Sequence, residues 1–170
     1  MLEAKEVNFA YRRGLPVLND IACTIGDGEF VALLGHNGSG KTTLSRLFMA
    51  LLHPRSGQVL VDGEDIVNYE PADLADKIGY VFQNPDDQLF LESVRKEFEF
   101  GPKQIGMPED EIQKRIEWVA ELVGLKDKLD MHPFDLTSTE KKFCTIGAII
   151  MMDPKAVIFD EPTCGQDVAG

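Results

Sequence analysis

One stretch near the N-terminus has the residue types and spacing of a phosphate-binding loop. Residues 35–43 read Gly35-His36-Asn37-Gly38-Ser39-Gly40-Lys41-Thr42-Thr43. Glycines let the backbone curl until several N–H groups point at one centre, and a following helix adds the positive end of its dipole. In this pattern the lysine, Lys41, reaches the β- and γ-phosphates, and the hydroxyl of Thr42 lies on Mg²⁺. The stretch therefore predicts binding of a polyphosphate with its metal ion.

Two adjacent carboxylates form a second candidate site near the other end of the chain. Asp160 and Glu161 directly follow the apolar run 156–159. Ligands of open α/β sheets bind at the carboxyl ends of the strands. There Asp160 would hold the Mg²⁺ shell, and Glu161 would polarise a water for attack on a γ-phosphate. The alternative is a strand that merely ends at charged residues, and the phosphate loop upstream favours the catalytic interpretation.

Gln83 and Tyr11 are further candidates, each with a simpler structural explanation. Gln83 follows the apolar run 78–82, so its side-chain oxygen could lie on Mg²⁺ or on a water at a strand end. The alternative is a loop glutamine in solvent. Tyr11 could stack on a nucleotide base, which needs only an aromatic face. Its spacing alone favours packing at a sheet edge.

The segments around these residues predict an α/β fold. Residues 30–34 form an apolar run typical of a strand buried on both faces, and residues 44–52 have helical spacing. Further strands are expected at 7–11, 17–25, 58–63, 78–82 and 156–159, a short helix at 70–76, and helices at 92–100, 108–123 and 140–152. The largely helical stretch 88–153 is an insertion between strands of the core. In it, one helical face is apolar, formed by Ile112, Ile116, Val119, Ala120 and Val123.

Composition excludes some classes of protein. The net charge of −12 argues against a nucleic-acid surface, which needs clustered Lys and Arg, but not against a local phosphate site. The N-terminus has no apolar signal core, and no stretch approaches the ~20 apolar residues of a membrane span. Cys23, Cys144 and Cys164 lack metal-ligand spacing, and Cys144 is expected in the core.

Taken in order, these motifs resemble the nucleotide-binding domain of ABC transporter ATPases along nearly the whole chain. The phosphate loop (Walker A motif), Gln83 of the Gln-loop, Asp160-Glu161 and the D-loop residues Gly165-Gln166-Asp167 follow the family's order. Residues 81–90, Val-Phe-Gln-Asn-Pro-Asp-Asp-Gln-Leu-Phe, are similar to the energy-coupling-factor and cobalt/nickel-importer branch.

The resemblance implies a P-loop NTPase fold, with an N-terminal antiparallel β region and a helical subdomain. Residues 1–170 would form a single, partial ABC ATPase domain that is incomplete at the C-terminus. Its α/β core would comprise 1–87 and 154–170, and its helical subdomain would comprise 88–153 with the signature region.

The resemblance also implies ATP and Mg²⁺ as cofactors. Tyr11 becomes the adenine-stacking residue, and the nucleotide would be held by Tyr11, Gly35, His36, Asn37, Gly38, Ser39, Gly40, Lys41, Thr42 and Thr43. Mg²⁺ would be held by Thr42, Gln83 and Asp160, and the catalytic residues would be Glu161 and Gln83. The implied partners are a second ABC ATPase subunit and a transmembrane coupling subunit, contacted through Gln83–Phe90, on the cytoplasmic face of the cell membrane. The implied function is ATP-driven import of a small solute, either a metal ion or a vitamin.

Two departures from the family pattern change these expectations. Where the family has Leu-Ser-Gly-Gly-Gln, this chain has Leu136-Thr137-Ser138-Thr139-Glu140. That motif caps the ATP of the opposite subunit, so the added Cβ atoms and the carboxylate predict a weak or inactive partner site and favour a heterodimer.

The second departure is the end of the chain soon after the D-loop. The histidines all precede Asp160, so none of His36, His53 and His132 can be the family's switch histidine. A strand expected between 30–34 and 156–159 is also missing. We therefore expect a truncated product that is not a competent ATPase alone. The alternatives are a non-hydrolysing, nucleotide-binding regulatory or structural subunit of a heterodimer, and a non-transport ABC ATPase that acts on DNA or ribosomes, which the acidic charge disfavours.

Overall fold

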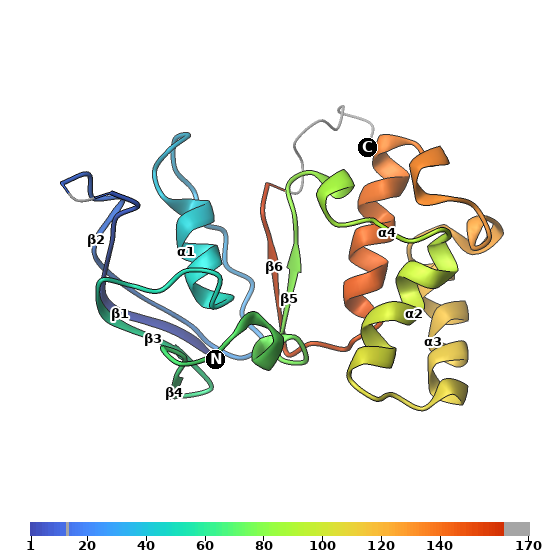
Figure 1. The fold of residues 1–170 in the computed structure, drawn as a ribbon, viewed down its shortest axis with the longest axis horizontal. Helices are drawn as coiled ribbons and strands as arrows, with labels where there is room; N and C mark the ends of the chain where they lie inside the picture. The colour runs from blue at the N-terminus through green and yellow to red at the C-terminus, as the bar shows by residue number, and fades with distance from the viewer. Residues whose placement is uncertain (13, 162–170) are drawn as a thin grey trace. The chain divides into compact units, whose positions relative to one another are not determined.

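The computed structural model describes residues 1–12 and 14–161, and the chain divides into two compact units, Met1–Ala75 and Asp76–Gly170 (Figure 1). The strands are β1 (Leu2–Phe9), β2 (Leu18–Ile25), β3 (Ser56–Val61), β4 (Glu64–Asp65), β5 (Ile78–Val81) and β6 (Ala156–Phe159). The α-helices are α1 (Lys41–Phe48), α2 (Val94–Gln104), α3 (Glu109–Leu122) and α4 (Ser138–Ile150). Short 3₁₀ helices are η1 (Pro71–Leu74), η2 (Pro85–Asp87), η3 (Lys126–Lys128) and η4 (Pro133–Asp135).

The first unit is an antiparallel sheet with one helix. Its strand order is β2-β1-β3-β4, and Leu2 of β1 is opposite Ile25 on one side and Val61 on the other. The helix α1 buries Thr43, Leu44, Leu47 and Phe48. This arrangement confirms the expected N-terminal antiparallel β region.

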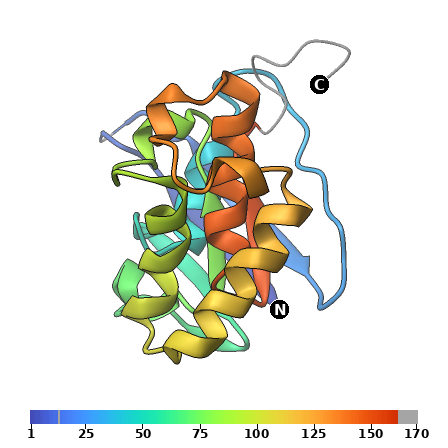
Figure 2. The ribbon, with the colours of Figure 1, turned by 90° about the vertical axis from the view of Figure 1, so that its right-hand side faces the viewer.

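The second unit combines a parallel pair of strands, β5 and β6, with a layer of helices. Figure 2 shows α2, α3 and α4 side by side in this layer. Their core contains Leu89, Val94, Phe98, Ile112, Ile116, Val119, Ala120, Val123, Leu125, Leu129, Leu136, Cys144 and Met151. The apolar face predicted for the helix at 108–123 and the buried position of Cys144 are therefore confirmed.

A glycine allows α4 to approach β5 closely. A Cβ atom on Gly79 would lie 2.2 Å from Cγ2 of Ile149, a distance that packed atoms do not adopt. Gly79 is therefore the residue that lets the helix lie directly on the strand that leads to Gln83.

The prediction of a buried strand at 30–34 was wrong, and that for 156–159 was wrong in part. Residues 30–34 lie outside both sheets of the described residues, and Phe30 and Leu34 are 96% and 88% exposed instead of buried. β6 forms as expected but is only partly buried, because it pairs with β5 along one edge and leaves Val157 and Phe159 exposed. An apolar run becomes a buried strand only when a neighbour takes up its N–H and C=O groups.

Within the described residues, no helix is long and apolar enough to cross a membrane. The boundaries of the α/β core at 1–87 and 154–170, and of the helical subdomain at 88–153, stay predictions. The D-loop residues Gly165-Gln166-Asp167 and Cys164 lie outside the described residues.

Candidate functional site

Residues 35–43 form a tight loop that opens directly into α1. Gly40 caps the helix with φ 95°, and the N–H of Leu44 bonds its carbonyl at 2.9 Å. Gly38 also has a left-handed backbone, with φ 81°, which only glycine adopts without strain. The first turn of α1 carries no acidic side chain, and Arg46 lies in its last turn. The helix dipole at this loop therefore favours an anion, and no carboxylate of that turn opposes it.

The side chain of Lys41 lies across the loop that precedes it. Its Nζ donates to the carbonyl oxygens of Gly35 at 2.9 Å and of His36 at 3.1 Å. Gly35 has no room for a side chain, because a Cβ atom there would lie 2.6 Å from Oγ of Ser39. Two backbone carbonyls thus hold the Lys41 ammonium over the loop, where its positive charge is available to a phosphate oxygen.

Tyr11 lies beside the phosphate loop through a direct contact with α1. Its hydroxyl is 3.2 Å from Oγ1 of Thr43, which is buried in the first turn of the helix. The ring packs edge-on against Phe9, with centroids 4.9 Å apart, and remains largely exposed. The contact with Phe9 agrees with packing at a sheet edge, and the contact with Thr43 places an aromatic ring next to a candidate nucleotide site. Packing at a sheet edge is therefore confirmed, and stacking on a base stays a prediction.

The parallel register of β5 and β6 brings the second group of candidates together. Val81 pairs with Phe159, so the residues that follow, Gln83 and Glu161, emerge at the same end. Nε2 of Gln83 donates to Oε2 of Glu161 at 2.6 Å. The hydroxyl of Tyr80 donates to Oδ2 of Asp160 at 2.9 Å. Both carboxylates are therefore held in place, Asp160 by a side chain of β5 and Glu161 by a side chain just after β5.

The oxygen atoms of the predicted metal ligands suit Mg²⁺. Hydroxyl, amide and carboxylate oxygens, as in Thr42, Gln83 and Asp160, are the ligands this hard cation prefers. In residues 1–12 and 14–161, no three His, Cys, Asp or Glu side chains gather as a metal site by themselves. Thr42 belongs to the first unit, and Gln83 and Asp160 belong to the second, so their joint binding of one Mg²⁺ stays a prediction.

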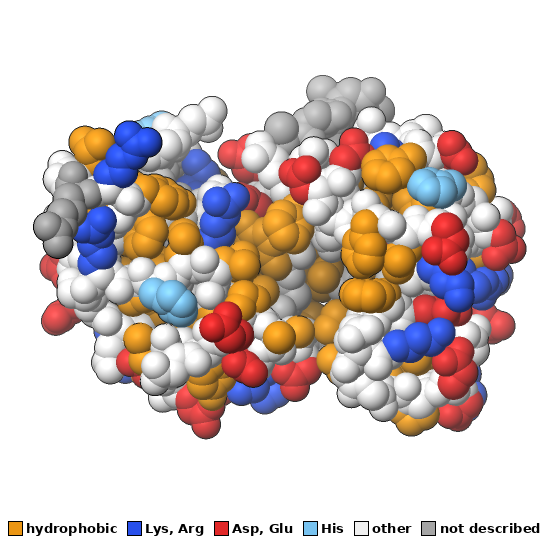
Figure 3. Space-filling model, in the orientation of Figure 1, with side chains coloured by type: hydrophobic (Ala, Val, Ile, Leu, Met, Phe, Trp, Pro, Cys, Tyr) orange, Lys and Arg blue, Asp and Glu red, His pale blue; other side chains and the backbone are white. Residues whose placement is uncertain are grey.

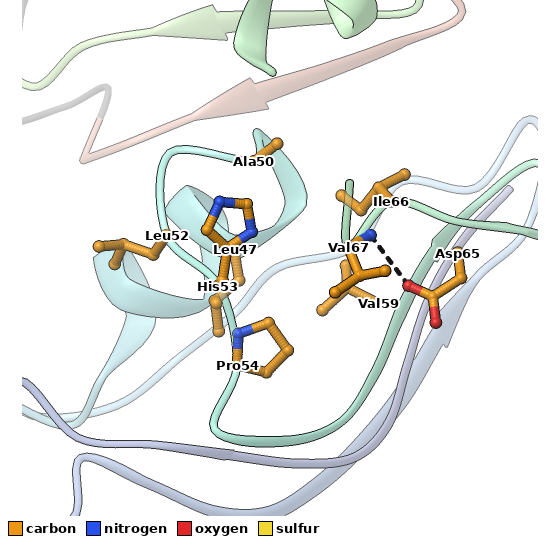
Figure 4. A pocket seen from close by; sticks show the side chains of 9 residues that line it. All are labelled: Leu47, Ala50, Leu52, His53, Pro54, Val59, Asp65, Ile66 and Val67. Atoms are coloured by element: carbon orange, nitrogen blue, oxygen red, sulfur yellow. Dashed lines mark hydrogen bonds between the residues drawn. The ribbon is translucent and has the colours of Figure 1, made fainter. Parts of the chain in front are cut away.

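A small hollow in the first unit is separate from the phosphate loop. It is open to solvent and lies between the C-terminal end of α1 and β3 (Figure 4). Its lining is Leu47, Ala50, Leu52, His53, Pro54, Val59, Asp65, Ile66 and Val67. The N–H of Val67 bonds Asp65 at 3.0 Å, so the carboxylate at its edge is already engaged by backbone. None of the predicted site residues lines this hollow.

A family model described as ABC transporter matches residues 18–164, most of the chain. The chain belongs to the ABC transporter family. Among its ABC relatives, a putative ABC transporter ATP-binding protein of Pyrococcus furiosus is 45% identical over 170 residues. An energy-coupling factor transporter ATP-binding protein of Clostridium perfringens is 42% identical over 177 residues, which covers 99% of this chain. The first match covers all of this chain, which spans 65% and 62% of the length of these two relatives.

Solved structures share the ABC fold. The cbiO1 protein of Clostridium perfringens, part of the ABC transporter complex cbiONQ, matches with a TM-score of 0.88 and 39% identity, over 98% of this chain and 67% of that one. An ATP-binding cassette solved as a dimer with ADP and Pi matches with a TM-score of 0.88 at 24% identity, over 99% of this chain and 77% of that one, and supports the fold alone. The expected ABC fold and the likeness to the energy-coupling-factor branch are thus confirmed.

At the position of the ABC signature motif, this chain carries a carboxylate, Glu140, that is hydrogen-bonded to other residues of the chain. Thr137 caps α4, and its side chain accepts the N–H of Glu140 while Glu140 accepts the N–H of Thr137 at 3.0 Å. Glu140 also pairs with Lys128. These bonds lower the pKa of Glu140 to about 2, and the bond from Lys128 has the largest effect. The first turn of α4 therefore carries its own anion.

Three residues that contact the segment after Gln83, namely Glu97, Phe100 and Lys141, were not predicted from the sequence. Glu97 of α2 is buried and accepts the N–H groups of Phe90 and Leu91 at 2.6 and 2.7 Å, although burial raises its pKa. The exposed ring of Phe100 packs edge-on against Phe90, with centroids 5.1 Å apart. Lys141 pairs with Asp86 at 2.8 Å. Each of these contacts joins α2 or α4 to the residues after Gln83. Because the partners are distant in the sequence or share no periodic pattern, the sequence did not predict the contacts.

Proposed function

We propose that this chain is the ATP-binding subunit of an ABC importer that couples ATP binding and hydrolysis to uptake of a small solute, a metal ion or a vitamin. The observation that carries the proposal is the 2.6 Å hydrogen bond from Gln83 to Glu161. It places the two predicted catalytic side chains in contact at the end of the strand pair. A strand that merely ended at charged residues would not need this partner.

ATP would be held by the first unit. The ring of Tyr11 would stack on adenine, and the amides of residues 35–43 would surround the phosphates. The ammonium of Lys41, which lies on the carbonyls of Gly35 and His36, would bind a phosphate oxygen at the loop. Mg²⁺ would be held by Thr42, Gln83 and Asp160, and when bound it neutralises charge on the phosphates.

Hydrolysis would depend on positioning by the second unit. Glu161 would accept a proton from the attacking water, and Gln83 holds one of its carboxylate oxygens in a fixed direction. Tyr80 does the same for Asp160. Phosphoryl transfer depends mainly on positioning and charge neutralisation, so fixed carboxylates are what this reaction needs.

The proposed partners are a transmembrane coupling subunit and a second ABC ATPase subunit, with the complex on the cytoplasmic face of the membrane. The surface for the coupling subunit would be Gln83–Phe90, extended by the exposed ring of Phe100. Figure 3 shows hydrophobic side chains on the surface among charged ones. Two relatives support this proposal, since one belongs to an energy-coupling factor transporter and another to the cbiONQ complex.

The altered signature stretch favours a different chain as the ATPase partner. A γ-phosphate brought to the first turn of α4 would meet the Glu140 carboxylate, and like charges repel strongly where water is excluded. The loss of one preorganised donor costs about 3 kcal/mol at a transition state. The site that α4 completes in a partner would therefore be the weak one, and catalysis would fall to the site that carries Glu161.

The test is ATP turnover by the assembled dimer with Glu161→Gln in this chain. We expect turnover to fall at least a hundredfold, since a general base contributes about 10²–10⁴, while Mg²⁺-ATP binding is retained. The matched control is Glu117→Gln, a change at an exposed position of α3, which should leave turnover unchanged.

A second candidate function is a nucleotide-binding subunit that does not hydrolyse ATP. The internal pairing of Glu140 with Lys128 favours it, because it removes a phosphate-binding feature of the family. Unchanged turnover in the Glu161→Gln dimer would support this second function and contradict the first.

A further inference from the structure

The segment of residues 84–91, which follows Gln83, has its apolar contacts near its C-terminal end, at Leu89 and Phe90. Leu89 is its buried hydrophobic side chain, whereas Phe90 is exposed. Its short helix η2 is capped by Asn84, which accepts the N–H of Asp86 at 3.3 Å. Such a segment needs contacts with other elements to keep one position.

Polar contacts fix this segment to two helices. Near its C-terminal end, one oxygen of the buried Glu97 carboxylate in α2 accepts the N–H groups of Phe90 and Leu91. Near its N-terminal end, Oδ1 of Asp86 lies 2.8 Å from Nζ of Lys141 in α4. The second contact joins residues that are 55 positions apart in the sequence.

The Asp86 side chain is 49% exposed, whereas its ion-pair partner, Lys141, is shielded from solvent. The Lys141 side chain is 15% exposed, and its ammonium lies 4.8 Å from the centre of the Phe134 ring. By contrast, Lys114 and Asp110 of α3 are 3.6 Å apart and 80% and 78% exposed. Solvent screens the attraction between an ammonium and a carboxylate less when the ammonium is shielded over an aromatic face than when it is fully exposed.

Lys141 also belongs to the first turn of α4. Its backbone N–H bonds the carbonyl of the cap residue Thr137 at 2.9 Å. We propose that Lys141 is a positioning residue that locks segment 84–91 to the first turn of α4, so that a displacement of the segment by a partner also displaces residues 137–141. The proposal rests on the proposed function only for the nature of that partner.

The experiment is amide hydrogen exchange on the whole chain, without nucleotide or partner. With Lys141→Met, exchange at Gln88 and Leu89, whose N–H groups bond the carbonyl of Pro85, should rise about fivefold, the size expected for one partly shielded ion pair. With Asp86→Asn, exchange in the first turn of α4 should rise by a similar factor. The double variant should exceed neither single variant, because both remove one interaction.

Two further variants separate positioning from general loosening. Lys114→Met removes an exposed pair and should change exchange in neither place. The exchanged pair, Asp86→Lys with Lys141→Asp, restores the opposite charges but not the ammonium over the Phe134 ring. It should therefore restore part of the protection, which a purely structural effect of either residue would not allow. Effects confined to the mutated residue's own element, or effects that add in the double variant, would overturn the proposal. Neither outcome bears on ATP binding or turnover, so the proposed function would stand or fall separately.

Discussion

At the scale of single residues, the contact between Tyr11 and Thr43 makes a specific prediction about nucleotide binding. Tyr11→Leu should weaken ATP binding about five- to a hundredfold, since base stacking contributes ~1–3 kcal/mol per base. Tyr11→Phe keeps the ring and loses only the hydroxyl contact with Thr43, so its effect should stay below about tenfold. Calorimetry with ATP and with inorganic triphosphate checks this, because triphosphate affinity should be equal in all three proteins. A loss of triphosphate affinity in Tyr11→Leu would show that the residue supports the loop and not the base.

Glu140 makes a prediction about pH. Its pKa is lowered from 4.5 to about 2 by Lys128 first and then by Thr137. A carboxylate with a lowered pKa in the folded state stabilises the protein above its unfolded pKa, and this contribution is lost as the pH falls toward the folded value. The melting-temperature difference between wild type and Glu140→Gln should therefore be largest near pH 6 and shrink toward pH 3. A difference that stayed constant over this range would contradict the pairing.

At the scale of elements, glycines set how closely α2 and α4 pack. A Cβ atom on Gly147 of α4 would lie 2.6 Å from Cζ of the fully buried Phe98. Gly147→Ala should cost up to about 2 kcal/mol in unfolding free energy, because overpacking costs ~1–3 kcal/mol and the helix-propensity gain is ~1 kcal/mol. The control is Gly101→Ala in α2, where the new Cβ atom meets the flexible end of Met152 and the two effects should nearly cancel. Equal unfolding free energies for the two variants in denaturant would contradict this packing.

The sequence predicted these elements unequally, for a physical reason. The apolar face of α3 was predicted because helical spacing is a local property, and Ile112, Ile116 and Val119 are all buried. The run 30–34 and strand β6 were predicted as buried, yet they are exposed or only partly buried, since strand burial depends on neighbours that local sequence does not specify.

At the scale of the whole molecule, the candidate site could be predicted where a motif carries it and not where tertiary contacts do. The loop around Lys41, the pair Asp160-Glu161 and Gln83 were candidates from the sequence, and the structure adds the direct contact between Gln83 and Glu161. The contacts of Glu97 and Lys141 with residues 86–91 join distant segments of the chain, so no local pattern reveals them.

The central claim is that the loop at 35–43 binds Mg²⁺-ATP, and equilibrium binding of Mg²⁺-ATP tests it most directly. Lys41→Ala should weaken binding about ten- to a hundredfold, the loss expected for a charge-assisted hydrogen bond of ~1.5–3 kcal/mol. Lys114→Ala, which removes an exposed ammonium in α3, should leave the affinity unchanged. Saturable binding to wild type that Lys41→Ala abolishes or weakens by this factor is the predicted result, and equal affinity of wild type and Lys41→Ala would contradict the claim.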